Sequence, residues 1–443
     1  MSSDAKGSGF FCGRSRSSME VCCCRKRIPT LSCAILLAIV AAATCANGES
    51  LPQLSPAEAG MSAEKLAEID GLVEKALAEK KMPGCVVLVG RRAGVVYRKA
   101  YGLRQVQPGE EAMTVDTVFD LASLTKPIAT ATAIMQLVDD GKLKVSDRVS
   151  EHWPEFGQNG KENVTVEHLL LHTSGLIADN ALRDYLDGTE KAWERIAALK
   201  LQQPSGEKFV YSDVNFLVLG KLVERLSGKT HDEFCRERIF EPLGMKESGY
   251  VRLANRRGRD SLSADAQDNG NPGLAEKESR PPMPRERYAP TEKRNGEWIR
   301  GEVHDPRAYY LDGVAGHAGV FSTADDLARY ASAMLQKGEL GEARLFSEET
   351  WKLMTTPREV PRGLRTYGWD SKSGFSSNRG QNFSSAAFGH GGFTGTAIWI
   401  DPELDLYVIF LSNRVHPDGK GSVNPLAGAI GTVAGESIAG RDK

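Results

Sequence analysis

Cysteine is scarce where a folded domain is expected. Six of the eight cysteines lie within the first 46 residues. The two that remain, Cys85 and Cys235, are far apart and form no C-x-x-C pair. We therefore expect neither a disulfide framework nor a cysteine-ligated metal, and we predict that both are buried free thiols.

Signatures of several other protein classes are also missing. The sequence contains no G-x-S-x-G, which excludes the nucleophile elbow of α/β-hydrolases. It contains no G-x-x-x-x-G-K-S/T, which excludes a P-loop. The 56 basic and 58 acidic residues balance, so no charge excess indicates a nucleic-acid partner. We expect no metal and no other cofactor.

Residues 1–46 differ from the rest of the chain. Arg25-Lys26-Arg27 is basic, residues 31–44 are uncharged and mostly apolar, and small residues follow around Thr44-Cys45-Ala46. These are the three parts of a secretory signal, and the apolar run is shorter than the roughly 20 residues of a membrane helix. We predict a signal peptide over 1–46 and an exported protein, periplasmic or extracellular. A retained N-terminal membrane anchor and lipidation of Cys45 are the alternatives.

Hydrophobic periodicity then predicts many helices and few strands. A capping-box pattern at Ser55–Glu58 predicts a helix over 55–81, and Thr230–Glu233 predicts another helix start. Further helices are expected at 123–140, 165–172, 213–227, 324–336 and 423–438. Strands are expected at 85–90, 95–101, 396–400 and 406–411.

The order of these elements favours an α+β fold. Few strands follow a βαβ rhythm, so we predict an antiparallel sheet built from both chain ends, flanked by helices, with a helical domain inserted. The sheet domain would comprise 47–120 and 305–443, and the helical domain 121–254. Residues 255–304 are charged with little apolar period and read as a surface loop.

The chemistry centres on one of four S-x-x-K patterns. Only Ser123-Leu124-Thr125-Lys126 follows an apolar approach and opens an apolar helix. Side chains three apart on a helix share a face, and burial favours the neutral form of a lysine, which could then help to remove the serine proton. The pattern predicts Ser123 as a nucleophile with Lys126 beside it.

Four further segments carry a family resemblance: Leu169–Leu176, Tyr211-Ser212-Asp213, Gly313–Thr323 and Phe388–Gly395. With the Ser123 motif, they resemble class C β-lactamases, low-mass penicillin-binding proteins and the related family VIII carboxylesterases. The resemblance covers about 55–435 and implies the β-lactamase/DD-peptidase fold and an acyl-serine intermediate.

The resemblance also implies roles for particular residues. Lys126 and Tyr211 would share the general-base and general-acid work. The N–H groups of Ser123 and Phe393 would form the oxyanion hole, and the substrate side would be formed by His390, Gly391, Gly392 and Asp213.

Two positions depart from the family pattern. Asp213 stands where β-lactamases usually have Asn; it could hold Lys126 by charge or cap the following helix. His390 stands where many members have Lys, and a histidine with a pKa of about 6.5 is mostly neutral at pH 7. This weakens the case for a β-lactamase. His172 is expected to be structural, whereas His304, Asp305 and His317 could pack together near the site.

We therefore expect an exported serine hydrolase that acts on a small ester or a D-alanyl peptide. A β-lactam is a less favoured substrate. Contact with the cell wall or a membrane surface is possible. The alternative from another class is a catalytically inactive binding or scaffold protein on the same fold. The sequence leaves the oligomeric state open.

Overall fold

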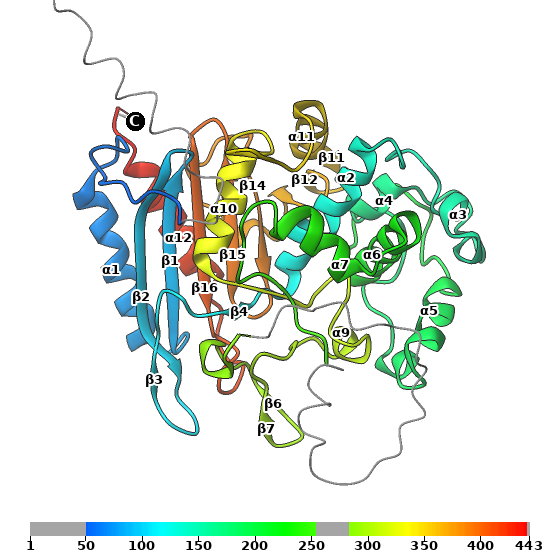
Figure 1. Ribbon diagram of the computed structural model, residues 1–443, viewed down its shortest axis with the longest axis horizontal. Coiled ribbons are helices and arrows are strands. Elements are labelled where there is room, and N and C mark those ends of the chain that lie inside the picture. Colours follow the sequence, from blue (N-terminus) through cyan, green and yellow to red (C-terminus); the bar gives the residue numbers. More distant parts are fainter. Residues whose placement is uncertain (1–49, 254–282, 441–443) are drawn as a thin grey trace, which may run out of the picture. The chain divides into compact units, whose positions relative to one another are not determined.

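Apolar strands from the two ends of the chain pair at the centre of the main sheet. β1 (Gly84–Arg91) lies between β2 (Gly94–Gln105) and β16 (Leu406–Ser412) and is antiparallel to both. The computed structural model describes residues 50–253 and 283–440, which fall within one unit (Figure 1). The predicted antiparallel sheet from both chain ends is confirmed.

The complete sheet has nine strands, and all neighbouring strands are antiparallel. Their order is β11 (Arg358–Val360), β12 (Gly363–Arg365), β13 (Asp370–Lys372), β14 (Phe388–Gly392), β15 (Thr396–Asp401), β16, β1, β2 and β3 (Glu111–Ala112).

Helices cover both faces of this sheet because its central strands are apolar on both sides. α1 (Ala63–Ala78) and α12 (Asn424–Glu436) pack together on the face that receives Val87 and Val89. α10 (Ala324–Leu335) packs on the other face, where Val86 and Leu88 belong to the larger core (Figure 1). Strands buried on both faces read as continuous apolar runs, as these do.

A helical region adjoins the α10 side of the sheet (Figure 1). It includes α2 (Thr132–Asp139), α3 (Val149–His152), α4 (Val166–Leu170), α5 (Thr189–Ala197), α6 (Asp213–Ser227) and α7 (His231–Cys235). A small sheet of β4 (Phe119–Asp120), β8 (Val320–Ser322) and β5 (Gly249–Tyr250) lies where the chain enters and leaves this region. The shorter remaining elements include α9 (Pro306–Tyr310), α11 (Glu348–Thr355) and the pair β9 (Glu339–Leu340) and β10 (Ala343–Arg344).

The first helix begins later than predicted. Ser55 and Glu58 do exchange hydrogen bonds, but they stabilise a turn that ends at Gly60, whose φ is +65°. The cap of α1 is Ser62, which accepts from the Lys65 N–H. The capping box at Thr230 is confirmed, and both Cys85 and Cys235 are buried free thiols as expected.

Part of the predicted surface loop 255–304 lies outside the described residues. From residue 283 onward it contains a hairpin, β6 (Lys293–Arg294) and β7 (Glu297–Trp298). Tyr288 is buried against Val118 and Phe321. The predicted signal peptide 1–46 also lies outside the described residues. Within the described ranges, no helix combines the length and hydrophobicity needed to cross a membrane.

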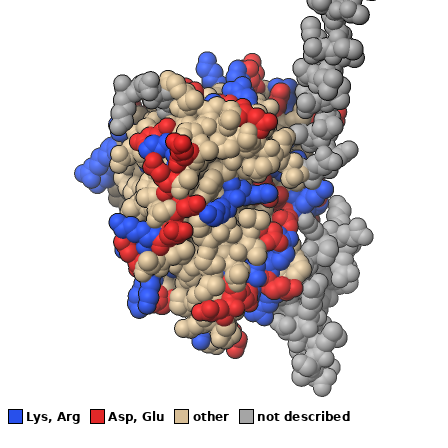
Figure 2. All heavy atoms as spheres, turned by 90° about the vertical axis from the view of Figure 1, so that its left-hand side faces the viewer, with Lys and Arg blue, Asp and Glu red and all other residues tan. Residues whose placement is uncertain are grey.

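Charges of both signs are interspersed on the face that carries α1 and the β2 edge (Figure 2). Lys65 forms an ion pair with Glu68, and Lys99 forms one with Asp70. The side chains of all four residues are partly exposed. Exposed pairs of this kind contribute little to stability, about 0–1 kcal/mol each.

β14 approaches the segment before Ser123 so closely that only glycine fits at one position. A Cβ on Gly392 would lie 2.4 Å from the Leu121 carbonyl oxygen and 2.1 Å from Thr396 Oγ1. By contrast, a Cβ on Gly374, in the loop after β13, would meet nothing within 4 Å.

We predict that Gly392→Ala separates β14 from the nucleophile segment. Overpacking of this kind costs about 1–3 kcal/mol, so the melting temperature should fall. Labelling of Ser123 by a fluorophosphonate should slow by about tenfold or more, since a displacement of about 1 Å at a reacting group can cost still more. Gly374→Ala is the matched control and should change neither. Equal behaviour of the two variants would contradict this account.

Candidate active site

Ser123 lies on a strained turn between β4 and a run of helical segments. The turn is a 3-10 helix over Ala122–Leu124, followed by π-helical residues Lys126–Ala131 and then α2. The single helix predicted over 123–140 is thus three pieces. Ala122 has a φ of +46°, and its N–H donates to Asp120 Oδ1 at 2.8 Å. Such strain and π-helical turns often occur at functional sites.

Lys126 is fully buried, and its ammonium has three neighbouring acceptors. Its Nζ lies 2.9 Å from Ser123 Oγ, 3.1 Å from the His317 carbonyl oxygen and 2.7 Å from Asp213 Oδ1. The first two contacts are hydrogen bonds, and the third is an ion pair.

The charge state of Lys126 differs from the sequence-based expectation. Burial lowers the pKa of Lys126, but the charge of Asp213 and the contribution of Tyr211 more than offset this, and the pKa is raised above its ordinary value. Lys126 is therefore an ammonium in the resting site. The expectation that burial neutralises it is wrong, because a carboxylate from another element lies against it.

Tyr211 and Asp213 are positioned by the start of α6. Ser212 caps this helix by accepting from the Asn215 N–H at 3.2 Å, so Asp213 is free to face Lys126 and is not the cap. The Tyr211 ring lies 5.1 Å from Lys126 Nζ, and its centroid lies 4.6 Å from the His172 ring. His172 Nδ1 accepts from the Ser212 N–H, which supports the structural role predicted for this histidine.

His390, on β14, is buried and is uncharged at neutral pH. His390 Nδ1 donates to the Gly391 carbonyl oxygen at 2.8 Å, and the His390 ring lies 5.9 Å from that of Tyr211. Burial, Arg365 and Lys126 hold the pKa of His390 well below 6.5. Neutrality at pH 7 is confirmed, but the charging expected near pH 6.5 is wrong.

The proposed oxyanion-hole groups come from two segments that are tied together. Phe393 follows β14, and the next residue, Thr394, donates through Oγ1 to the Asp120 carbonyl oxygen at 2.7 Å. Arg414 donates to the Phe393 carbonyl oxygen. Among the hydrogen bonds of the described residues, none uses the N–H of Ser123 or Phe393. Both N–H groups are therefore available to a ligand.

A second carboxylate and a histidine lie next to Asp213. His317 Nε2 is 3.0 Å from Asp305 Oδ1, and Asp305 also accepts from the N–H groups of α9. Burial alone would raise the pKa of Asp305, but His317 and these N–H groups hold it well below its ordinary value. His304 does not join them: its ring stacks on Phe393 at 5.3 Å, and its Nε2 pairs with Glu292.

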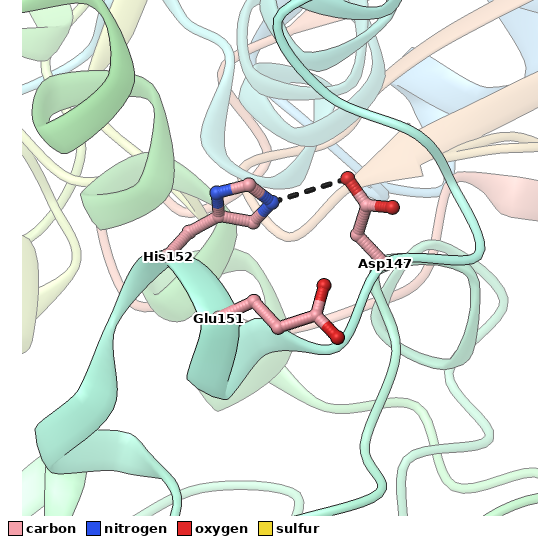
Figure 3. Close-up of side chains that lie close together, drawn as sticks. All are labelled: Asp147, Glu151 and His152. Atoms are coloured by element: carbon pink, nitrogen blue, oxygen red, sulfur yellow. Dashed lines mark hydrogen bonds and ion pairs between the residues drawn. The ribbon is translucent and has the colours of Figure 1, made fainter.

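Two groups of described side chains could each supply three metal ligands. Asp213, Asp305 and His317 form one, where the Lys126 ammonium already lies against Asp213. Asp147, Glu151 and His152 form the other (Figure 3). There, Asp147 accepts from the Lys144 N–H and lies 3.1 Å from His152 Nε2. These contacts belong to a local turn and explain why the three side chains lie close together.

His168 and His172 are four residues apart, a spacing that suits zinc on a helix. They do not act together, because α4 ends at Leu170 and His172 has a φ of +59°. His168 Nδ1 instead accepts from the Thr165 N–H at 3.1 Å as part of a capping box.

Sequence reasoning missed two residues beside this site. Arg365, on β12, is fully buried 3.5 Å from Asp370 and 5.4 Å from the Phe209 ring. Phe375 is half exposed, with its ring centroid 4.9 Å from that of Tyr211. Neither belongs to a motif, so no local pattern could have identified them.

Comparison with known proteins gives consistent results. A family model described as Beta-lactamase matches residues 69–431. The N-acetylmuramyl-L-alanine amidase of Bacillus subtilis (strain 168) is 33% identical over 390 residues, covering 82% of this chain and 85% of the relative. A putative D-alanyl-D-alanine carboxypeptidase of Escherichia coli (strain K12) is 30% identical over 406 residues, covering 86% and 89%.

Solved structures resemble the fold at lower identity. A class C β-lactamase superposes with a TM-score of 0.65 at 19% identity, covering 86% of this chain and 98% of the other. A penicillin-binding-protein homologue from Caulobacter crescentus gives 0.63 at 21%, covering 85% and 99%. The hydrolase EstCE1 gives 0.62 at 21%, also covering 85% and 99%. These likenesses support the predicted fold.

We predict that Ser123→Ala abolishes activity and fluorophosphonate labelling without unfolding the protein. Loss of a serine nucleophile costs on the order of a million-fold in kcat. Ser62→Ala and Ser205→Ala are matched controls from the other S-x-x-K copies outside the leader, and both should label normally. Full labelling of the Ser123 variant, mapped by mass spectrometry, would contradict the assignment of Ser123 as the nucleophile.

We also predict that Asp213→Asn lowers the pKa of Lys126 relative to the wild type, since the charge that offsets burial is removed. The pKa can be read from the ¹³Cε shift of labelled lysine, assigned with Lys126→Arg. Asp187→Asn, on the surface, is the control. An unchanged Lys126 titration in the Asp213 variant would show that Asp213 does not set its charge.

Proposed function

The chain belongs to the beta-lactamase family, and from this premise we propose that it hydrolyses an amide bond of cell-wall material through an acyl-Ser123 intermediate. Membership makes it a serine hydrolase of the β-lactamase, penicillin-binding-protein and esterase type. The proposal concerns the bond that is cut and the surroundings of that bond.

The observation that carries the proposal is the contact between Lys126 Nζ and Ser123 Oγ, next to the carboxylate of Asp213. An amine leaves a tetrahedral intermediate only when it gains a proton, whereas an alcohol leaves more readily without one. Lys126 has a raised pKa and lies 2.9 Å from Ser123 Oγ, so a proton donor is present where the leaving nitrogen would form. An ester would not require this arrangement.

The proton steps balance without another reactant. Lys126 gives a proton to Asp213 as Ser123 gives its own proton to Lys126, and Oγ bonds to the carbonyl carbon. The N–H groups of Ser123 and Phe393 hold the oxyanion. When the C–N bond breaks, the nitrogen takes a proton from Lys126, directly or through Tyr211, and Asp213 returns its proton to Lys126. Water then hydrolyses the acyl-enzyme.

The uncharged His390 favours one kind of amide. A D-alanyl-D-alanine substrate and a β-lactam both carry a carboxylate near the scissile bond, and a neutral histidine offers it no fixed charge. In peptidoglycan the carboxyl group of that L-alanine is bound to the next residue of the stem peptide, so the bond between the muramyl lactyl group and L-alanine has no free carboxylate beside it. The relative named N-acetylmuramyl-L-alanine amidase supports this choice, and those named as putative carboxypeptidases keep the D-alanyl peptide as the second candidate.

Two further points concern the location of the enzyme and the alternative of an inactive protein. An exported enzyme would meet such a substrate at the cell wall, which agrees with the signal pattern over 1–46. The inactive-scaffold alternative is disfavoured, because an inactive protein would have no need for a buried ammonium placed against a serine hydroxyl.

Rates measured side by side on N-acetylmuramyl-L-alaninamide, which has no free carboxylate at the alanine, a D-alanyl-D-alanine peptide, a p-nitrophenyl ester and nitrocefin test the substrate class. We expect the muramyl amide to have the highest kcat/KM, by about tenfold or more, because no lost carboxylate contact penalises it. The ratio of nitrocefin to ester rates should be flat from pH 5.5 to 8, since His390 stays neutral. A D-alanyl peptide or ester ahead of the muramyl amide would refute the proposal.

A further inference from the structure

Three aromatic rings near Lys126 form what we term the aromatic wall: Phe375, Tyr211 and His390. Phe375 lies 4.9 Å from Tyr211, and Tyr211 lies 5.9 Å from His390, between ring centroids. Phe375, at one end of the wall, is 50% exposed. A second phenyl ring, Phe393, follows directly after β14 and is 60% exposed.

The loop that carries Phe375 is held in place. The Phe375 N–H donates to Ser373 Oγ at 3.2 Å, and Ser376 Oγ donates to Asp370 at 2.6 Å. The ring itself packs edge-on against Phe209 at 6.0 Å and tilts over Tyr211 by 32°. Phe375 is therefore exposed in a fixed orientation. A ligand that binds to it would cause little further loss of side-chain entropy.

The Phe393 ring, after β14, is held by contacts of its own. It stacks on His304 at 5.3 Å with 27° between the planes, and the Arg414 guanidinium lies 4.8 Å from its centroid. Single exposed apolar residues are ordinary on protein surfaces. Two exposed phenyl rings that are each ordered by their own packing, one against Tyr211 and one in the segment that follows β14, are a better indication of a binding surface.

The wall carries no charge at neutral pH. His390 is uncharged, and its other members are phenyl and phenol rings. The carboxylates near Lys126, Asp213 and Asp305, come from other segments. A ligand that lies against the wall should therefore offer a neutral, flat and largely apolar face.

We propose that the aromatic wall binds the pyranose ring of an N-acetylated amino sugar on the acyl side of the substrate, with Phe375 as the main specificity residue. The C–H groups on one face of a pyranose form a flat apolar patch that matches a phenyl ring, and its hydroxyls stay in water. This inference rests on the proposed function, since it supplies the part of a muramyl amide that the catalytic residues do not touch.

The test compares two amides that differ only in the sugar: N-acetylmuramyl-L-alanine and D-lactyl-L-alanine. The quantity measured is the ratio of their kcat/KM values. Phe375→Ala should lower this ratio by about tenfold or more, mainly through the KM of the muramyl amide. Phe375→Trp should retain it. Leu186→Ala, which truncates another exposed apolar side chain (57% exposed), is the matched control and should leave the ratio unchanged.

The possible outcomes test the proposed sugar site separately from the proposed hydrolysis. If Phe375→Ala slows both amides equally, the residue only supports Tyr211, and the sugar site is overturned. If wild-type protein cleaves neither amide although Ser123 is labelled by fluorophosphonate, the proposed function fails. Saturation-transfer NMR with methyl N-acetylglucosaminide on Ser123→Ala protein then decides the wall by itself. Contacts to the sugar C–H protons that disappear with Phe375→Ala support it, and their absence overturns it.

Discussion

A buried ammonium ion that needs three acceptors is the constraint on which the site depends. Taking a lysine out of water costs several kcal/mol unless its charge is compensated. Lys126 finds Ser123 on its own turn, a backbone carbonyl at His317 before β8, and the Asp213 carboxylate at the start of α6. Three segments far apart in the sequence must therefore meet at one atom, and that meeting defines the catalytic centre.

The main sheet supplies the second boundary of the site. β14 touches the nucleophile segment closely enough that a side chain at Gly392 would collide with Leu121. Hydrogen bonds from Thr394 and Thr396 to Asp120 and Leu121 fix the same contact. The sheet thereby holds the segment of Phe393, whose N–H is the proposed second donor of the oxyanion hole, against the residues that precede Ser123. The central strands thus hold the Phe393 N–H in a fixed position. A donor that is already in place stabilises an oxyanion best.

Electrostatics divide the surroundings of Ser123 into two parts. Around Lys126, anionic groups keep a proton donor charged. Along β14, burial together with the charges of Arg365 and Lys126 keeps His390 neutral. The same cation thus has opposite effects on its neighbours: it attracts Asp213 and prevents a second positive charge at His390. His390 stands where many similar sequences have a lysine, and at neutral pH it adds no second positive charge beside Lys126.

The sequence by itself determined what depends on neighbouring residues: the Ser123 motif, the apolar runs that become β1, β15 and β16, the cap at Thr230 and the glycines of β14. Helix 55–81 was predicted too long because the Ser55–Glu58 pattern also suits a turn. Only the tertiary structure decided the charge of Lys126, the neutrality of His390 and the places of Arg365 and Phe375. A pKa depends on every charge within a few ångströms and on the exclusion of water, and folding brings those groups together from segments that no local pattern connects.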